Sequence, residues 1–85
     1  MTRDLLDILR HTLGLDRSDM PFRNHFAAAT GTPDYARCER LTTAGMMKRG
    51  AALSYGHYFH VTEQGLRALD PALAPLSPDG ARGEG

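Results

Sequence analysis

The 85 residues suffice for one small domain, and ten basic and ten acidic residues cancel to a net charge of zero. This balance argues against a strongly basic nucleic-acid coat and against a highly acidic tail protein. Leu and Ala, with 11 each, make up more than half of the apolar residues, whereas Val61 and Ile8 are the single Val and the single Ile. The composition therefore favours a helical domain with a small hairpin over a large β-sheet.

The cysteine count and the hydropathy pattern bear on the compartment. Cys38 is the single cysteine, which excludes a disulfide framework within the chain and a Cys-rich zinc site. The first residues alternate charge with leucine, unlike a signal peptide, and no apolar run approaches the roughly 20 residues of a membrane span. We therefore expect a protein of a reducing cytoplasm without a membrane partner.

Two helices are predicted in the first third of the chain. Residues 3–13 have Thr2 in place to cap the helix, Asp4 in the first turn and Gly14 at the stop. Five apolar residues at helical spacing form one broad stripe on it: Leu5, Leu6, Ile8, Leu9 and Leu13. After a polar loop, the four-residue spacing of Phe22 and Phe26 predicts a second, short helix over residues 22–29.

The third predicted helix, over residues 33–44, has the clearest start signal. Thr32 is a good N-cap residue, Pro33 fits the first helical position and Asp34 complements the helix dipole. Gly45 follows the last helical residue, where a left-handed stop is favoured.

A hairpin and a last short helix are predicted to complete the domain. Residues 46–51 and 57–62 are expected to pair as strands, and residues 63–69 to form a helix. Residues 70–85 are rich in Pro and Gly without an aromatic residue, which predicts a flexible tail after a domain of residues 1–69. The predicted core collects the apolar positions of all these elements: Leu5, Leu9, Leu13, Phe22, Phe26, Cys38, Leu41, Phe59, Val61, Leu66 and Leu69.

This element order is that of a winged helix-turn-helix, a mainly α fold with a small β-hairpin (α+β): three helices, a two-stranded wing and a short C-terminal helix. The run GMMKR from Gly45, with HVTEQG from His60, resembles the wing of such domains, where a Val-Thr-x-x-Gly turn closes the second strand. The stretch from Leu5 to Leu15, with RNHF from Arg23, is similar to small prophage proteins of GC-rich bacteria, some of which are anti-CRISPR inhibitors. The winged-helix resemblance spans roughly residues 5–69, and the similarity to prophage proteins implies the cytoplasm of a bacterial host.

Catalytic and metal chemistry find little support in the sequence. Cys38 falls on the inward stripe of the third helix, and nothing in the sequence orients or activates it. His57 and His60 are three residues apart, which places them on opposite faces of a strand, and no ligand pair has a standard zinc spacing. We expect no metal, no cofactor and no enzymatic activity.

Two clusters are candidates for binding a partner or DNA. The first combines the cations that follow Asp34, with only Glu39 as an acidic neighbour: Arg37, Arg40, Lys48 and Arg49. The second is Arg23, Asn24 and His25, which either project from the predicted second helix as a binding surface or are solvated residues that satisfy a turn. Tyr55 and His57, from the hairpin, complete the candidate set.

Two functions remain open. One is a protein-binding, phage-type inhibitor that contacts a host nucleoprotein complex such as Cas subunits, as the resemblance implies. The other is a winged-helix transcription regulator that binds DNA as a homodimer through the first cluster, with the apolar stripe of residues 3–13 as the dimer interface. Asp34 at the start of the recognition helix, and nine basic against seven acidic groups in residues 1–69, argue against strong duplex binding by a monomer.

Overall fold

The computed structural model describes residues 2–69, so the predicted tail over residues 70–85 lies outside the described residues. The elements, in chain order, are α1 (Arg3–Leu13), β1 (Phe26–Ala29), α2 (Pro33–Thr43), β2 (Met47–Leu53), β3 (Gly56–Val61) and α3 (Glu63–Leu69). The strands form one antiparallel sheet in the order β1-β3-β2. The domain is therefore α+β, with three helices and three strands in the described part.

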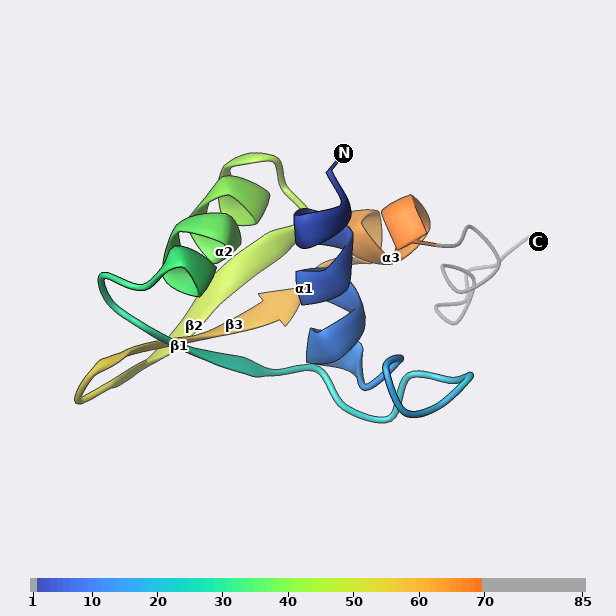
Figure 1. Cartoon of the computed structure of the whole chain (residues 1–85), viewed down its shortest axis with the longest axis horizontal. Coiled ribbons are helices and arrows are strands. Elements are labelled where there is room, and N and C mark those ends of the chain that lie inside the picture. Colours follow the sequence, from blue (N-terminus) through green and yellow to red (C-terminus); the bar gives the residue numbers. More distant parts are fainter. Residues whose placement is uncertain (1, 70–85) are drawn as a thin grey trace.

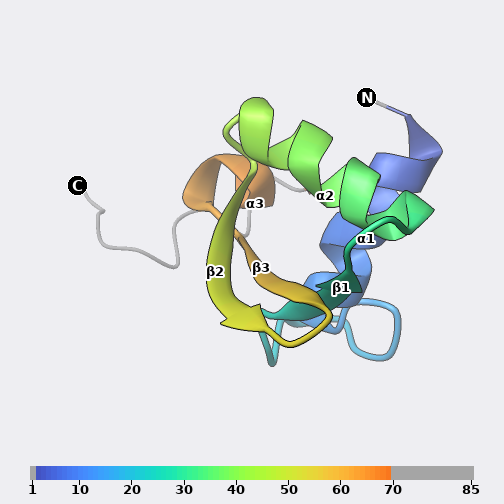
Figure 2. The ribbon, with the colours of Figure 1, turned by 90° about the vertical axis from the view of Figure 1, so that its left-hand side faces the viewer.

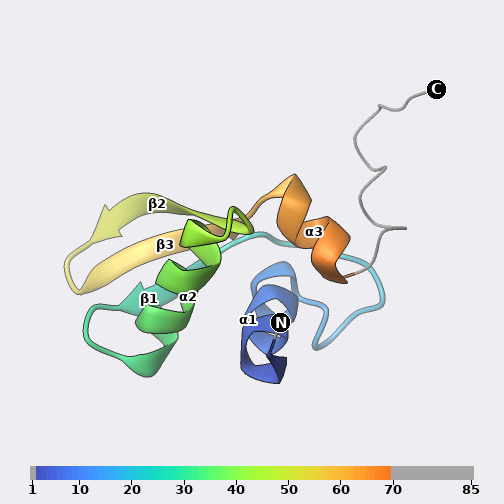
Figure 3. The same cartoon turned by 90° about the horizontal axis from the view of Figure 1, so that it is seen from above.

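The helices gather on one face of the sheet. Helices α1 and α2 lie over that face, and α3 lies beyond the end of β3, beside α1 (Figures 1 and 3). A view at right angles shows the strands as a curved layer whose other face is covered by no helix of residues 2–69 (Figure 2). The core lies between the sheet and the helices, and its largest fully buried side chains come from both layers: Phe59, Leu9, Leu41, Met47, Thr12 and Cys38.

Helix α1 forms over the predicted residues. Its apolar stripe is turned into the core, and Gly14 ends it with a φ of 82°, a left-handed conformation that glycine adopts without steric penalty. Thr2 occupies the N-cap position, but its side chain makes no capping hydrogen bond. The hydroxyl of the buried Thr12 donates to the Ile8 carbonyl over 2.6 Å, which satisfies a polar group that has left water.

Helix α2 begins at Pro33, after the N-cap residue Thr32, as predicted. The Thr32 hydroxyl accepts from the Tyr35 amide at 3.2 Å, with Pro33 at the first turn. Cys38 and Leu41 are buried, as predicted, and Tyr35 is buried beside them. Gly45 then turns the chain toward β2.

The Val-Thr-x-x-Gly motif anchors α3 to the turn that follows α2. The Thr62 hydroxyl donates to the Gly45 carbonyl at 2.6 Å and accepts from the Gly65 amide at 3.2 Å. The Thr62 amide donates to the Met46 carbonyl. These bonds join the start of α3 to the start of β2, and they explain physically why a short helix of seven residues is stable here.

The predicted helix over residues 22–29 is wrong. This segment is extended and ends in β1, which pairs with β3 from Phe26↔Phe59 to Ala29↔Gly56. An isolated eight-residue helix is marginal in water, whereas β3 offers a free edge for pairing. Gly56 has no Cβ, so the Ala28 carbonyl can approach it closely, and tertiary pairing outweighs the helix propensity of three alanines.

This error also changes the predicted core. Phe22 is 59% exposed rather than buried, and its ring lies against Gly14. Phe26, Leu66 and Leu69 are only partly buried against the core. The other predicted core residues are buried, and the core also contains members outside the predicted set: Ile8, Thr12, Ala28, Tyr35 and Met47. The hairpin prediction is confirmed as β2 and β3, with β1 as an additional strand.

Candidate binding surfaces

The predicted basic cluster does not form a free cationic surface on α2. The Arg37 guanidinium lies 3.0 Å from an Asp34 carboxylate oxygen and 3.4 Å from one of Asp4. Two carboxylates therefore offset the charge that a phosphate would need. Arg40 is exposed, and within residues 2–69 it has no ion pair, but Glu39 is its neighbour on the same surface.

The two cations of β2 point to opposite faces of the sheet. Arg49 lies opposite the fully buried Phe59 in the register of β2 and β3. With Glu39 and Thr42 it lines a small hollow under α2. Lys48 pairs with His60 and is exposed. Since side chains alternate along a strand, the predicted cluster is divided between the helix-covered face and the uncovered face.

The second predicted cluster lies in the extended segment before β1, and two of its three members have structural roles. Arg23 donates to the His11 carbonyl at 2.7 Å and lies 3.7 Å from Asp16. The Asn24 side chain accepts from the Val61 amide and donates to the Val61 carbonyl at 2.9 Å, so it continues the strand pairing beyond β1. His25 is the member that faces solvent.

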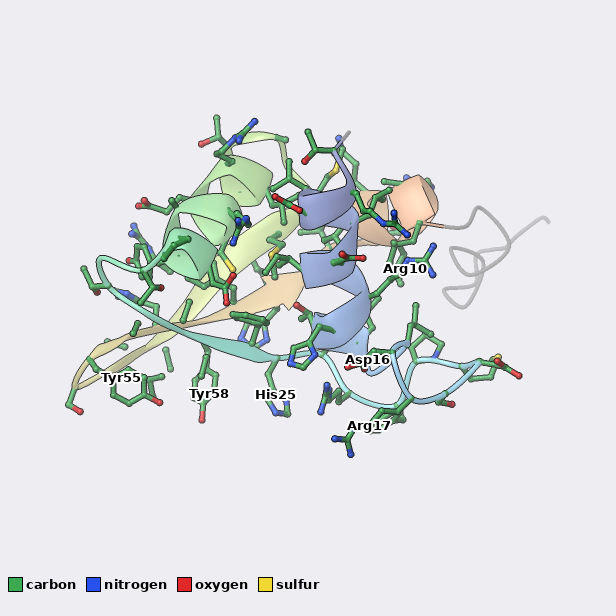
Figure 4. The ribbon with its side chains drawn as sticks, viewed as in Figure 1. Arg10, Asp16, Arg17, His25, Tyr55 and Tyr58 are labelled. Atoms are coloured by element: carbon green, nitrogen blue, oxygen red, sulfur yellow. The ribbon has the colours of Figure 1, made fainter. Side chains whose placement is uncertain are left out.

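The uncovered face of the sheet brings together a different set of side chains, which we name the open sheet face: His25, Lys48, Tyr55, Tyr58 and His60. The labelled rings of Tyr55, Tyr58 and His25 point away from α1 and α2, to the same side (Figure 4). The His25 and Tyr58 rings pack edge to face, with centroids 6.0 Å apart and planes at 90°. Tyr55 is 56% exposed in the hairpin turn.

The ring of His60, on the middle strand β3, contacts the chain on both of its sides, the segment before β1 and strand β2. Its Nδ1 lies 2.7 Å from the Asn24 carbonyl oxygen, and the opposite side of the ring lies over Gly50 of β2. A side chain at Gly50 would collide with the ring, so the glycine allows it to lie flat on the sheet. The ring is thereby held in place by contacts on both sides.

Charge is distributed unevenly between the two layers. The three strands and the hairpin turn contain Lys48 and Arg49 but no Asp or Glu. The acidic residues of the described part lie on the helices or in the loops beside α1 and α2. Asp16, in the loop after α1, is held by His11 at 2.9 Å, a hydrogen bond that lowers the pKa of the Asp16 carboxyl. Although the net charge of the chain is zero, the strands and the hairpin turn carry only positive charge.

Several candidate chemical groups have structural partners. His57 projects to the helix side of β3, where its Nδ1 lies 3.1 Å from the Tyr35 hydroxyl, while His60 lies on the other face, as predicted. Residues 2–69 contain no group of three or more His, Cys, Asp or Glu side chains placed to hold a metal ion. Within the same residues, no helix is long and apolar enough to cross a membrane.

Cys38 is fully buried in the core, and desolvation raises the pKa of its thiol from 9.0 to about 12, with Asp34 adding to the rise. The thiol is therefore neutral near pH 7 and is a poor nucleophile in the folded protein.

A pH-dependent stability is expected from Cys38. The unfolded thiol ionises near 9.0, whereas the folded one holds its proton to about 12, so the unfolded state loses a proton first. The free energy of unfolding should therefore be unaffected by this group below pH 9 and fall as the pH rises toward 12. Urea denaturation between pH 8 and 11 measures this fall, and the Cys38→Ala variant should show a shallower one. Equal slopes for the two proteins would contradict the prediction.

Along β3, Phe59 and Val61 alternate with Tyr58 and His60, so the first two lie in the core and the other two on the outward face. Strand β1, and with it the neighbourhood of His25, was missed from the sequence alone, because only the pairing of β1 with β3 brings His25 against Tyr58. Comparisons of the chain with protein-family models, with curated proteins and with solved structures gave no match.

Proposed function

We propose that this protein is a non-catalytic, phage-type binding protein that acts on a host nucleoprotein complex through its open sheet face, with anti-CRISPR inhibition as the specific form. The observation that carries the proposal is the set of exposed and half-buried rings on the outward face, together with Lys48, on a sheet that contains no carboxylate. Such a face suits a partner whose surface is anionic and carries groups that pack on rings.

The scaffold belongs to the same proposal. We infer a winged-helix-like domain in which α2 stands in the position of the third helix and the β2–β3 hairpin is the wing. Support comes from the element order after α1 and from the Val-Thr-x-x-Gly motif, whose hydrogen bonds close the hairpin against Gly45. The domain departs from the pattern between α1 and α2, where an extended segment and β1 replace a helix.

That departure weighs against the alternative of a dimeric transcription regulator. A helix-turn-helix reads DNA with one helix while the preceding helix crosses the backbone, and here β1 precedes α2. Arg37 is occupied by Asp34 and Asp4, so it adds little attraction for phosphates. The apolar stripe of α1, which the sequence offered as a dimer interface, is buried inside the domain except for the half-buried Leu6.

A phage-plaquing assay tests the proposal. The protein is expressed in a panel of bacterial hosts, each with one type of CRISPR–Cas system that targets the infecting phage. We expect the wild-type protein to restore plaques in at least one host, the Tyr58→Ala/Lys48→Ala variant to lose this effect, and Arg40→Ala on α2 to keep it.

The same assay can overturn the proposal in two ways. Unchanged immunity across the panel would do so, as would full activity of the Tyr58→Ala/Lys48→Ala variant. Sequence-selective binding of the wild-type protein to duplex DNA, tighter than about 1 µM at physiological salt, would favour the regulator instead, because non-specific binders lie near 10⁻⁴–10⁻⁶ M there.

A further inference from the structure

We propose that the open sheet face binds single-stranded nucleic acid directly, with bases stacked on its rings and phosphates near its cations. This inference rests on the proposed function and names the component of the nucleoprotein partner that the face contacts. It assigns the binding to β3 and its neighbours rather than to α2.

The rings offer surfaces on which bases can stack. Tyr58 lies at the centre of the face, on the middle strand, and His25 packs against it at right angles, which restricts the motion of both rings. Tyr55 lies beyond Tyr58, at the turn of the hairpin, on the same side (Figure 4). Base–aromatic stacking needs flat rings held in place and tolerates any base, because every base has a π-face.

The charges around these rings complement a polyanion. Lys48 lies directly across from His60, on the outward side of β2. Arg17 projects to the same side from the loop after α1 (Figure 4). No carboxylate of the strands opposes them, and Asp16 is already held by His11 and Arg23. A strand that crosses the face from the hairpin turn toward Arg17 would therefore pass rings in the middle and cations beside them.

Single strands fit this face better than a duplex. In B-form DNA the flat surfaces of the bases are hidden in the stack, so the rings of a sheet cannot reach them. A single strand exposes its bases and can spread over a small flat sheet.

Fluorescence anisotropy of the full chain with labelled oligonucleotides tests the inference. The probes are a mixed-sequence single strand of roughly 12 nucleotides, as RNA and as DNA, and the matching duplex. A length of roughly 12 nucleotides lies within the site sizes of single-strand binders. We expect both single strands, or one of them, to bind more tightly than the duplex. The preference between RNA and DNA then identifies which kind of strand the face is built for.

Variants locate the site on the face. Tyr58→Ala should raise the Kd for the single strand about 5- to 150-fold, as expected for one lost stacking contact, whereas Tyr58→Phe keeps the ring and should bind like the wild type. Tyr55→Ala, in the exposed turn, provides a second loss that does not depend on the packing of Tyr58. The association constant falls as salt rises, and Lys48→Ala should make the slope of log K against log salt less steep by about 0.7. Arg40→Ala, on the other layer, should leave this slope unchanged.

Absence of saturable binding to both single strands overturns the inference, and so does binding that Tyr58→Ala and Tyr55→Ala leave intact. The proposed function is judged separately, by plaque restoration. Plaques that depend on Tyr58 and Lys48 without any oligonucleotide binding would show that the face contacts protein, so the inference would fail while the proposed function stands.

Discussion

The Phe59→Ala variant is expected to lower the free energy of unfolding by about 3–5 kcal/mol, the usual range for a phenylalanine truncated in a core. Phe59 is fully buried on the middle strand, and the Tyr35 ring packs edge to face against it at 5.4 Å. The truncation leaves a cavity at the centre of the contact between the sheet and α2. Since small domains have only about 5–15 kcal/mol of stability, much of the population should unfold near 37 °C. Urea denaturation followed by circular dichroism measures the loss.

The matched control is the adjacent residue on the same strand. Tyr58→Ala removes a ring of similar size from the opposite, uncovered face, so we expect a loss of less than about 1 kcal/mol. Similar losses for Phe59→Ala and Tyr58→Ala would mean that the outward face of β3 is covered in solution, which would contradict the layer arrangement. A stable Tyr58→Ala protein is also the condition that makes its binding data interpretable.

Gly65→Ala is expected to destabilise the domain by up to about 2 kcal/mol, although alanine is the better helix former. A Cβ at this position would collide with the Met46 carbonyl and lie 2.7 Å from a Val61 methyl. Overpacking against backbone costs about 1–3 kcal/mol, whereas the gain in helix propensity is about 1 kcal/mol, so the collision decides the sign. The substitution should push α3 away from the turn after α2, which thermal unfolding detects as a lower Tm.

An exposed position of the same helix separates propensity from packing. Ala68 faces solvent, so Ala68→Gly should cost only the propensity difference of about 1 kcal/mol. If Gly65→Ala raised the Tm instead, α3 would not pack closely on the Met46 carbonyl, and the role assigned here to the Val-Thr-x-x-Gly motif would be wrong.

The sequence by itself determined the elements whose signals are local. Helix α2 is specified by Thr32 as a cap that accepts from the Tyr35 amide and by Pro33 at the first turn, and both lie within one helical turn. The hairpin and α3 also rest on local features, since side chains alternate along β2 and β3 and the Thr62 hydroxyl accepts from the Gly65 amide three residues later. These signals are read correctly because capping and strand alternation act mainly between neighbouring residues, although the bonds of Thr62 to Gly45 and Met46 add stability to α3.

Only the tertiary structure decided the fate of residues 22–29 and the location of the open sheet face. Phe22 and Phe26 have helical spacing, yet Phe26 pairs with Phe59, which lies 33 positions later in the chain. The Asn24 side chain bonds to Val61, across a similar separation. Such pairing depends on whether β3 has a free edge and on whether Gly56 lets the Ala28 carbonyl approach, and neither condition is encoded near β1. The contact of His25 with Tyr58 follows from the same pairing, which brings the segment before β1 alongside β3. Lys48 and Arg49 lie on opposite faces because side chains alternate along β2, and the helices cover one of those faces.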